Sequence, residues 1–219
     1  LGENSKLDGG FIVARDISDT RRYQQQLEAH NSRLKLESLT DSLTSLPNRR
    51  AFDRRLTDEL NRAVENRKAA VLLLDLDAFK PYNDRFGHAA GDDALRITAR
   101  VLEKQLRDVD QVARLGGEEF GIIMGSAGRR EALAIAERCR AAMESAPWPL
   151  RQVTVSIGVA LLQTRDDAKS ILVRADEALY AAKNGGRNQV AFVPQRAVGS
   201  KAQAPTSRKE RRKPGKVTN

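Results

Sequence analysis

The stretch Val71-Leu72-Leu73-Leu74-Asp75-Leu76-Asp77 is an apolar run that ends in two acids. A short continuous apolar run of this kind is typical of a buried strand. A carboxylate at its end costs desolvation energy unless it is paired or binds a metal. Because strand side chains alternate between faces, we expect Asp75 and Asp77 to point to the same face at one end of a sheet. The alternative is that these two acids cap the helical turn that follows.

A second acidic segment follows about forty residues later, at Gly116-Gly117-Glu118-Glu119. Gly-Gly between two apolar segments predicts a tight hairpin turn. In a regular strand Glu118 and Glu119 point to opposite faces, so they should differ in role. Two acidic ends brought together form a site for a hard cation such as Mg²⁺, which takes oxygen ligands and usually binds with substrate phosphates. The two acidic segments together therefore indicate nucleotide chemistry. The alternative for the hairpin is an exposed tip without a role, and the hairpin alone would be a weak signal.

Two further polar residues are candidates for reading a purine base, Asn83 and Asp92. A carboxylate accepts hydrogen bonds from the N1–H and the exocyclic amine of guanine, and an amide can both donate and accept. A buried polar group left unpaired by the wrong base penalises that base. For Asp92 the alternative is that it caps a helix that begins after Gly91.

Three basic residues are candidates for neutralising a triphosphate: Lys80, Lys183 and Arg187. The segment 183–188 also resembles a helix end with a glycine C-cap, where basic residues complement the helix dipole. Without the acidic motifs, that second interpretation would be favoured.

The pattern of the main part of the chain predicts alternating helices and strands, with two strands adjacent in sequence. We expect helices over about 48–65, 91–106, 129–145 and 167–183, and strands over 69–75, 111–115, 118–124, 153–160 and 188–193. This order predicts an α/β (α+β) domain with a mixed, mostly antiparallel sheet of about five strands flanked by helices.

Composition adds constraints on the chain outside that domain. The single Cys139, within a helical pattern, excludes an internal disulfide framework and is expected to be a buried structural thiol. No apolar stretch approaches the roughly 18 residues that span a membrane. We expect a cytoplasmic domain, and because the chain begins with Leu1 an anchor upstream in a longer protein stays open.

Residues 196–219 form a basic tail that carries most of the net charge of +9. We expect a disordered, solvated end without a role, in preference to a tether for nucleic acid or an anionic membrane.

The first 39 residues divide into two segments. Residues 1–17 include a strand-like end, and residues 18–39 are polar and helix-forming. Tyr23, Leu27, His30 and Leu34 follow one another at spacings of 4, 3 and 4, which is typical of a coiled-coil seam. We expect a linker helix that pairs with a second copy, in preference to a lone solvated helix.

Taken together, the segments resemble the GGDEF domain of diguanylate cyclases over about 41–193. The matching segments are 41–50, 75–80 with 83–84, 87–88, 91–92, 114–120, 156–158, 175–180, Lys183 and 186–188. Many motifs in order at family spacing make a specific match, although each alone would be weak. Residues 1–17 resemble the last strand of a PAS sensor domain, whose end often has a sequence similar to Arg15-Asp16-Ile17-Ser18-Asp19.

The resemblance implies a palm-like fold, similar to nucleotidyl cyclase domains, and condensation of two GTP into cyclic di-GMP with release of two pyrophosphates. It implies a homodimer, because one domain of this family binds one GTP. Asp75, the Leu76 carbonyl and Glu118 would hold Mg²⁺, for which Mn²⁺ can substitute. Glu119 would be a general base or a ligand of a second metal ion. The remaining implied substrate contacts are Asn83, His88 and Asp92 at guanine and Lys80, Lys183 and Arg187 at the phosphates.

The resemblance also implies product inhibition. Arg107-Asp108-Val109-Asp110 matches an RxxD motif, so that Arg107 and Asp110, with Arg138, would bind cyclic di-GMP; the alternative is a charged turn. Two positions depart from the family pattern: Ser45 replaces a usual Gly, and Glu118 replaces Asp. Neither predicts an inactive enzyme. The alternative function is a catalytically silent receptor of GTP or cyclic di-GMP. We expect no nucleic-acid partner, although a tethering role of the basic tail would create one.

Overall fold

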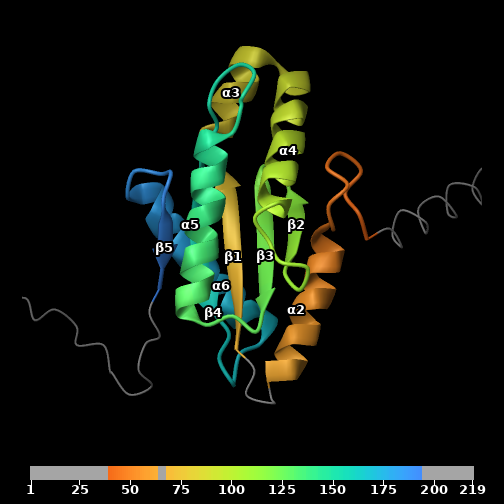
Figure 1. Cartoon of the computed structure of the whole chain (residues 1–219), viewed down its shortest axis with the longest axis vertical. Helices are drawn as coiled ribbons and strands as arrows, with labels where there is room; N and C mark the ends of the chain where they lie inside the picture. Colours follow the sequence, from red (N-terminus) through yellow and green to blue (C-terminus); the bar gives the residue numbers. More distant parts are fainter. Residues whose placement is uncertain (1–38, 64–67, 194–219) are drawn as a thin grey trace, which may run out of the picture.

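The computed structural model describes residues 39–63 and 68–193 (Figure 1). The predicted PAS-like end, the linker seam and the basic tail lie outside the described residues. The elements in chain order are α2 Arg49–Ala63, β1 Ala69–Leu76, α3 Phe79–Phe86, α4 His88–Glu103, β2 Gln111–Gly116, β3 Glu119–Gly125, α5 Arg129–Ser145, β4 Val155–Leu161, α6 Ala168–Asn184 and β5 Val190–Phe192. None of the helices in this described part is long and apolar enough to cross a bilayer.

The five strands of the described residues form one sheet in the order β2-β3-β1-β4-β5. The pairs β2–β3, β3–β1 and β1–β4 are antiparallel, and only β4–β5 is parallel. The sequence-based prediction of a mixed, mostly antiparallel five-stranded sheet is therefore confirmed. Its most buried strand, β1, is the apolar run that ends in the acids.

Helices cover both faces of this sheet, and each face has its own core (Figure 1). Leu72, Leu74 and Leu76 of β1 pack in the larger core, with residues of α3, α4 and α5. Val71, on alternate positions of the same strand, packs in the smaller core with Phe52 of α2 and residues of α6. By the same alternation, Asp75 belongs to the face that α2 and α6 cover.

The region between β1 and β2 differs from the prediction. A separate short helix, α3, was not predicted, and α4 begins at His88 rather than after Gly91. Gly87, with φ 84°, lies between the two helices and breaks them apart. Gly91 lies within α4 and does not precede it. Its lack of a side chain leaves room for the Asn83 amide. Helix capping by Asp92 is therefore wrong as an alternative.

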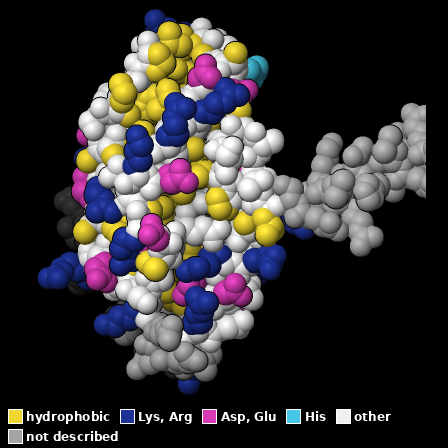
Figure 2. All heavy atoms as spheres, turned by 45° about the vertical axis from the view of Figure 1, so that its right-hand side comes forward, with side chains coloured by type: hydrophobic (Ala, Val, Ile, Leu, Met, Phe, Trp, Pro, Cys, Tyr) yellow, Lys and Arg dark blue, Asp and Glu magenta, His cyan; other side chains and the backbone are white. Residues whose placement is uncertain are grey.

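The described surface carries charges of both signs. Figure 2 shows Lys and Arg side chains interspersed with Asp and Glu over the face in view, with hydrophobic side chains between them. On that face the positive net charge of the sequence is not gathered into one basic surface.

Candidate functional site

The two acidic segments meet at one end of the sheet. The Leu76 N–H donates to the Glu118 carbonyl at 3.3 Å, and Asp75 lies directly opposite Glu119 in the β1–β3 register. The hairpin is tight, as predicted: Gly116 and Gly117 both have positive φ, and Glu118 lies in the turn itself. Antiparallel pairing therefore brings Asp75, Leu76, Glu118 and Glu119 together from segments forty residues apart.

Asp75 is buried and has a basic partner from α6. Its side chain is 12% exposed, and its Oδ2 lies 2.8 Å from the Lys183 Nζ. A buried carboxylate at a strand end is expected to need such a partner. The pairing also places Lys183, a predicted phosphate ligand, next to a predicted metal ligand.

The donor atoms at this end of the sheet suit a hard cation. The predicted set is two carboxylates, from Asp75 and Glu118, and one backbone carbonyl, from Leu76. Among residues 39–63 and 68–193 there is no group of three His, Cys, Asp or Glu that could hold a metal without other ligands. Mg²⁺ usually keeps waters and substrate phosphates as ligands and needs only one or two protein carboxylates. Two carboxylates and one carbonyl are therefore donors of the kind that Mg²⁺ accepts when other ligands complete its shell.

The predicted base-reading residues lie together across α3 and α4. A Cβ atom built on Gly91 would lie only 1.8 Å from Asn83 Oδ1, so the Asn83 amide rests directly on α4, beside Asp92. His88 begins α4 one turn before Asp92. Asn83 Oδ1 is buried and has no hydrogen-bond partner within the described part of the chain. An unpaired buried acceptor is costly and needs an explanation, of which a ligand donor is one.

The two other predicted phosphate ligands are exposed. Lys80 lies in the first turn of α3, directly after the acidic end of β1, and Arg187 lies in the turn after α6. That helix ends at Asn184 with Gly185 as its C-cap, as predicted, but Gly185 is not left-handed. The left-handed backbone falls instead on Gly186, Arg187 and Asn188.

Arg107 and Asp110 bind each other. Arg107 Nε and Nη2 donate to the two oxygens of Asp110 at 2.9 and 2.8 Å, and the Asp110 side chain is fully buried. The hydrogen bond to Asp110 raises the pKa of Arg107. Arg138 Nη2 donates to the carbonyl of Gln105, so all three residues of the predicted product site lie near one turn. The same arrangement is also expected for the alternative interpretation, a charged helix-to-strand turn without a ligand.

Asp77 has a role that the sequence did not indicate. It lies just beyond β1 and does not cap α3, whose N-cap Ala78 makes no side-chain hydrogen bond. Instead it accepts from Thr154 Oγ1, Ser156 Oγ and the Asn188 N–H. The capping alternative is thus wrong for Asp77, and its partners lie too far along the chain for spacing to have indicated them.

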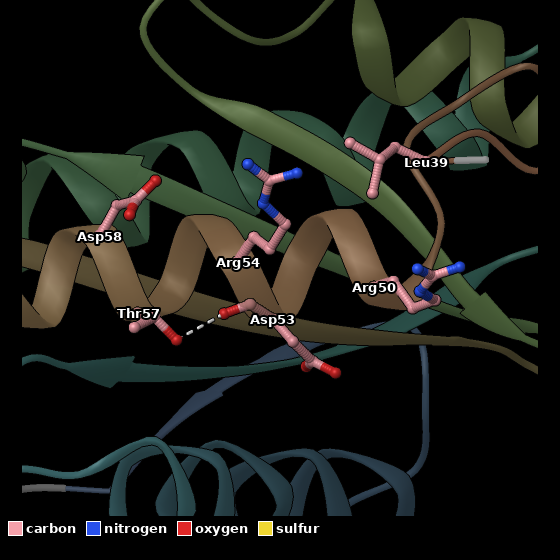
Figure 3. A pocket seen from close by; sticks show the side chains of 6 residues that line it. All are labelled: Leu39, Arg50, Asp53, Arg54, Thr57 and Asp58. Atoms are coloured by element: carbon pink, nitrogen blue, oxygen red, sulfur yellow. Dashed lines mark hydrogen bonds between the residues drawn. The ribbon is translucent and has the colours of Figure 1, made fainter. Parts of the chain in front are cut away.

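A separate groove of about 590 Å³ runs along the outside of α2 (Figure 3). Its lining residues are Leu39, Arg50, Asp53, Arg54, Thr57 and Asp58. None of these is a predicted site residue, and the Thr57 hydroxyl is used within the helix, donating to the Asp53 carbonyl. We assign no chemistry to this groove.

Comparison with known proteins identifies the family. A family model described as "Diguanylate cyclase, GGDEF domain" matches residues 38–189. The chain belongs to the GGDEF-domain family of diguanylate cyclases. This GGDEF chain is 38% identical over 175 residues to diguanylate cyclase DgcP of Pseudomonas aeruginosa, covering 76% of this chain and 26% of DgcP. It is 40% identical over 161 residues to the response regulator PleD of Caulobacter vibrioides, covering 70% of this chain and 36% of PleD. The chain thus spans well under two thirds of these relatives.

Solved GGDEF structures share the fold. The GGDEF domain of DgcB from Caulobacter crescentus, in complex with c-di-GMP, superposes with a TM-score of 0.68 at 35% identity, covering 71% of this chain and 96% of that one. The active GGEEF domain of a diguanylate cyclase from Vibrio cholerae gives 0.66 at 32% identity, covering 69% and 99%. The hairpin of this chain has the same five letters, Gly116-Gly117-Glu118-Glu119-Phe120. The predicted family and its palm-like fold are confirmed.

Proposed function

We propose that this GGDEF domain condenses two molecules of GTP into cyclic di-GMP and releases two pyrophosphates. The observation that carries the proposal is the meeting of the two acidic segments, with Leu76 hydrogen-bonded to Glu118 and Asp75 opposite Glu119, in a chain of this family. The named relatives support the reaction class, since several are diguanylate cyclases.

In each of the two bond-forming steps, the 3′-hydroxyl oxygen of one GTP attacks the α-phosphorus of the other. A P–O bond forms, the bond to the bridging oxygen breaks, and pyrophosphate leaves with its electron pair. Glu119, which is exposed beside Asp75, takes the hydroxyl proton. Asp75, Glu118 and the Leu76 carbonyl would hold Mg²⁺, or Mn²⁺ in its place, which supplies charge neutralisation at the reacting phosphate and lowers the pKa of the attacking hydroxyl.

The remaining residues bind and orient the nucleotide. Asn83 and Asp92, with His88 nearby, recognise guanine. Asn83 Oδ1 is buried against Gly91, so it would accept from an N–H of the base once the amide turns away from α4. Lys80 and Arg187 bind the phosphates, and Lys183 exchanges its bond to Asp75 for a phosphate oxygen. Opposite charge preorganised at the phosphates stabilises the transition state.

Two copies must face each other, because one domain supplies one GTP. The proposed linker pairing at Tyr23–Leu34 would raise the effective concentration of the two half-sites. Cyclic di-GMP would bind at Arg107, Asp110 and Arg138 and slow synthesis. For this, the product must compete with Asp110 for the guanidinium of Arg107, whose side chain is 42% exposed.

The test is synthesis of cyclic di-GMP from GTP and Mg²⁺, followed by chromatography. Glu118→Gln keeps the size of the side chain but removes its charge, and the rate should fall by about 100-fold or more. Asp58→Asn, on the exposed outer side of α2, is the control and should keep the parent rate. Specific activity should rise with protein concentration, and added cyclic di-GMP should reduce it.

GTP binding without product from the parent chain, at high protein concentration, would contradict the proposal and favour a silent receptor. Equal rates for the parent and Glu118→Gln would contradict the metal role of Glu118.

A further inference from the structure

The turn after α6 has a backbone that its residues do not favour. Arg187 and Asn188 are left-handed, with φ of 65° and 44°, and neither is glycine. Left-handed backbone is sterically unfavourable for an L-residue, less so for Asn, and persists where the surroundings hold it. The contacts that hold this turn also fix the backbone from which the Arg187 side chain extends. They therefore matter for Arg187 as a proposed phosphate ligand.

Asp77 holds the turn from the sheet. The Asn188 N–H donates to Asp77 Oδ2 at 2.9 Å, and the Thr154 hydroxyl donates to the same oxygen at 2.8 Å. The Ser156 hydroxyl donates to Asp77 Oδ1 at 2.6 Å. One carboxylate therefore joins the end of β1, the strand β4 and the turn after α6.

The side chain of Asn188 is held from α5. Its Oδ1 accepts from Arg140 Nη1 at 2.9 Å, and its Nδ2 donates to Glu144 Oε1 at 2.8 Å. Arg140 and Glu144 are themselves paired at 2.8 Å. An amide is suited to this position because it donates at one end and accepts at the other. Both the backbone and the side chain of Asn188 are thus fixed by charged partners.

We infer that Asp77 and Asn188 form a clasp that positions Arg187 for the nucleotide phosphates. Both are positioning residues, and the inference rests on the proposed function. Asp77 is two residues from Asp75 along the chain, and Asn188 is next to Arg187. The clasp therefore fixes the distance between the proposed metal ligands and a proposed phosphate ligand. Before a nucleotide binds, the Lys183–Asp75 ion pair is a second link between the same two segments.

Asp77→Asn tests the clasp with a side chain of the same shape. It removes one acceptor oxygen where three donors converge, so the Asn188 N–H or a hydroxyl loses its partner. We expect the KM for GTP to rise about 10-fold, because a small displacement of a substrate-binding group is costly. If Asp77 acts through Arg187, its substitution in an Arg187→Ala background should change KM by less than about 2-fold, since coupled residues are not additive.

A matched control separates positioning from general loss of stability. Asp166 is also a buried carboxylate with several donors, accepting from the Gln163 N–H at 2.7 Å and from Arg174 Nη2 at 2.6 Å. Asp166→Asn should lower the melting temperature, leave KM within about 2-fold of the parent value, and show no coupling to Arg187→Ala. Asn188→Gly is a second variant, which keeps the N–H and the left-handed backbone but loses the bonds to α5. Glycine adopts this backbone without strain, so a rise in KM for this variant would report the loss of the bonds to α5.

Hydrogen exchange of the amides in 185–189 provides a readout that does not need activity. Exchange at Asn188 should be slow in the parent and faster in Asp77→Asn, whether or not the chain makes cyclic di-GMP. Unchanged exchange would overturn the clasp even in an active enzyme. Faster exchange with fully additive effects of Asp77→Asn and Arg187→Ala would overturn positioning. A parent that makes no product would count against the proposed function, and the coupling would then be measured on GTP affinity.

Discussion

Ser45 has a left-handed backbone, with φ of 61°, in the loop that leads into α2. The resemblance to the family implies glycine at this place, and the backbone gives a reason, because only glycine adopts it without a steric cost. Ser45→Gly should therefore raise the free energy of unfolding by about 0.5–1 kcal/mol, the left-handed cost less the added entropy of a glycine in the unfolded chain. Urea unfolding measures this change.

The control for Ser45 lies in the same loop. Ser42 is exposed and its φ is not positive, so Ser42→Gly relieves no strain and should leave stability unchanged or slightly lower. A stabilising effect of both substitutions would show that the backbone argument is wrong for Ser45.

At the same scale, the sequence indicated some site residues and missed others for a physical reason. Asp75 and Glu118 could be proposed as site residues because each lies at or beside the end of an apolar strand, where a carboxylate is unusual. The role of Asp77 could not be predicted, because its partner Asn188 is 111 residues away and only the folded sheet brings them together. The pairing of Lys183 with Asp75 likewise depends on how α6 crosses the sheet.

At the scale of elements, α6 packs unusually close to β4 at Gly158. A Cβ atom built on Gly158 would lie 2.2 Å from the Ala175 carbonyl oxygen and 2.2 Å from the Leu179 nitrogen, both backbone atoms of α6. Gly158→Ala must therefore push the helix off the strand, and it should destabilise the domain by about 3 kcal/mol, the upper part of the range for overpacking. Thermal unfolding should show a drop of about 6–12 °C for a protein of this size.

Gly128→Ala is the matched control for that element contact. The nearest atoms to its Cβ would lie 3.9 Å away, and its φ of −87° suits any residue. Its effect should be about 1 kcal/mol or less, because alanine is a poorer N-cap than glycine but meets no backbone atom here. If Gly158→Ala lowers the free energy of unfolding no more than Gly128→Ala does, α6 moves away from β4 at little energetic cost.

The elements themselves followed from periodicity where the pattern was strong. The five strands and the helices α2, α5 and α6 lie within two residues of their predicted bounds. The helices α3 and α4 could not be separated from the sequence. Their division depends on the backbone of Gly87, and the place of Gly91 inside a helix depends on its contact with Asn83.

At the scale of the whole molecule, Asp41 links the segment that enters the domain to the acidic hairpin. Its carboxylate accepts from the Thr44 hydroxyl at 2.7 Å and from Arg114 Nη1 at 3.2 Å. Arg114 also donates to the Gly117 carbonyl, in the turn that carries Glu118. The Arg114 guanidinium thereby binds both Asp41 and Gly117, which are the two ends of a 77-residue span.

This link should depend on pH. Burial raises the pKa of Asp41, but the hydrogen bonds from Thr44 and Arg114 outweigh it and hold the pKa below the ordinary value of 3.8. Because the pKa is lower in the folded state, the stabilisation is fully present above about pH 4 and is lost as the pH falls through the folded-state pKa. Asp41→Asn should therefore lower the free energy of unfolding by about 1–2 kcal/mol at pH 7, and the difference from the parent should shrink toward pH 2. Urea unfolding at pH 7, 4 and 2 measures this, with the exposed Asp84→Asn as control. A difference that stays constant over that range would mean that Asp41 contributes through packing rather than through its charge.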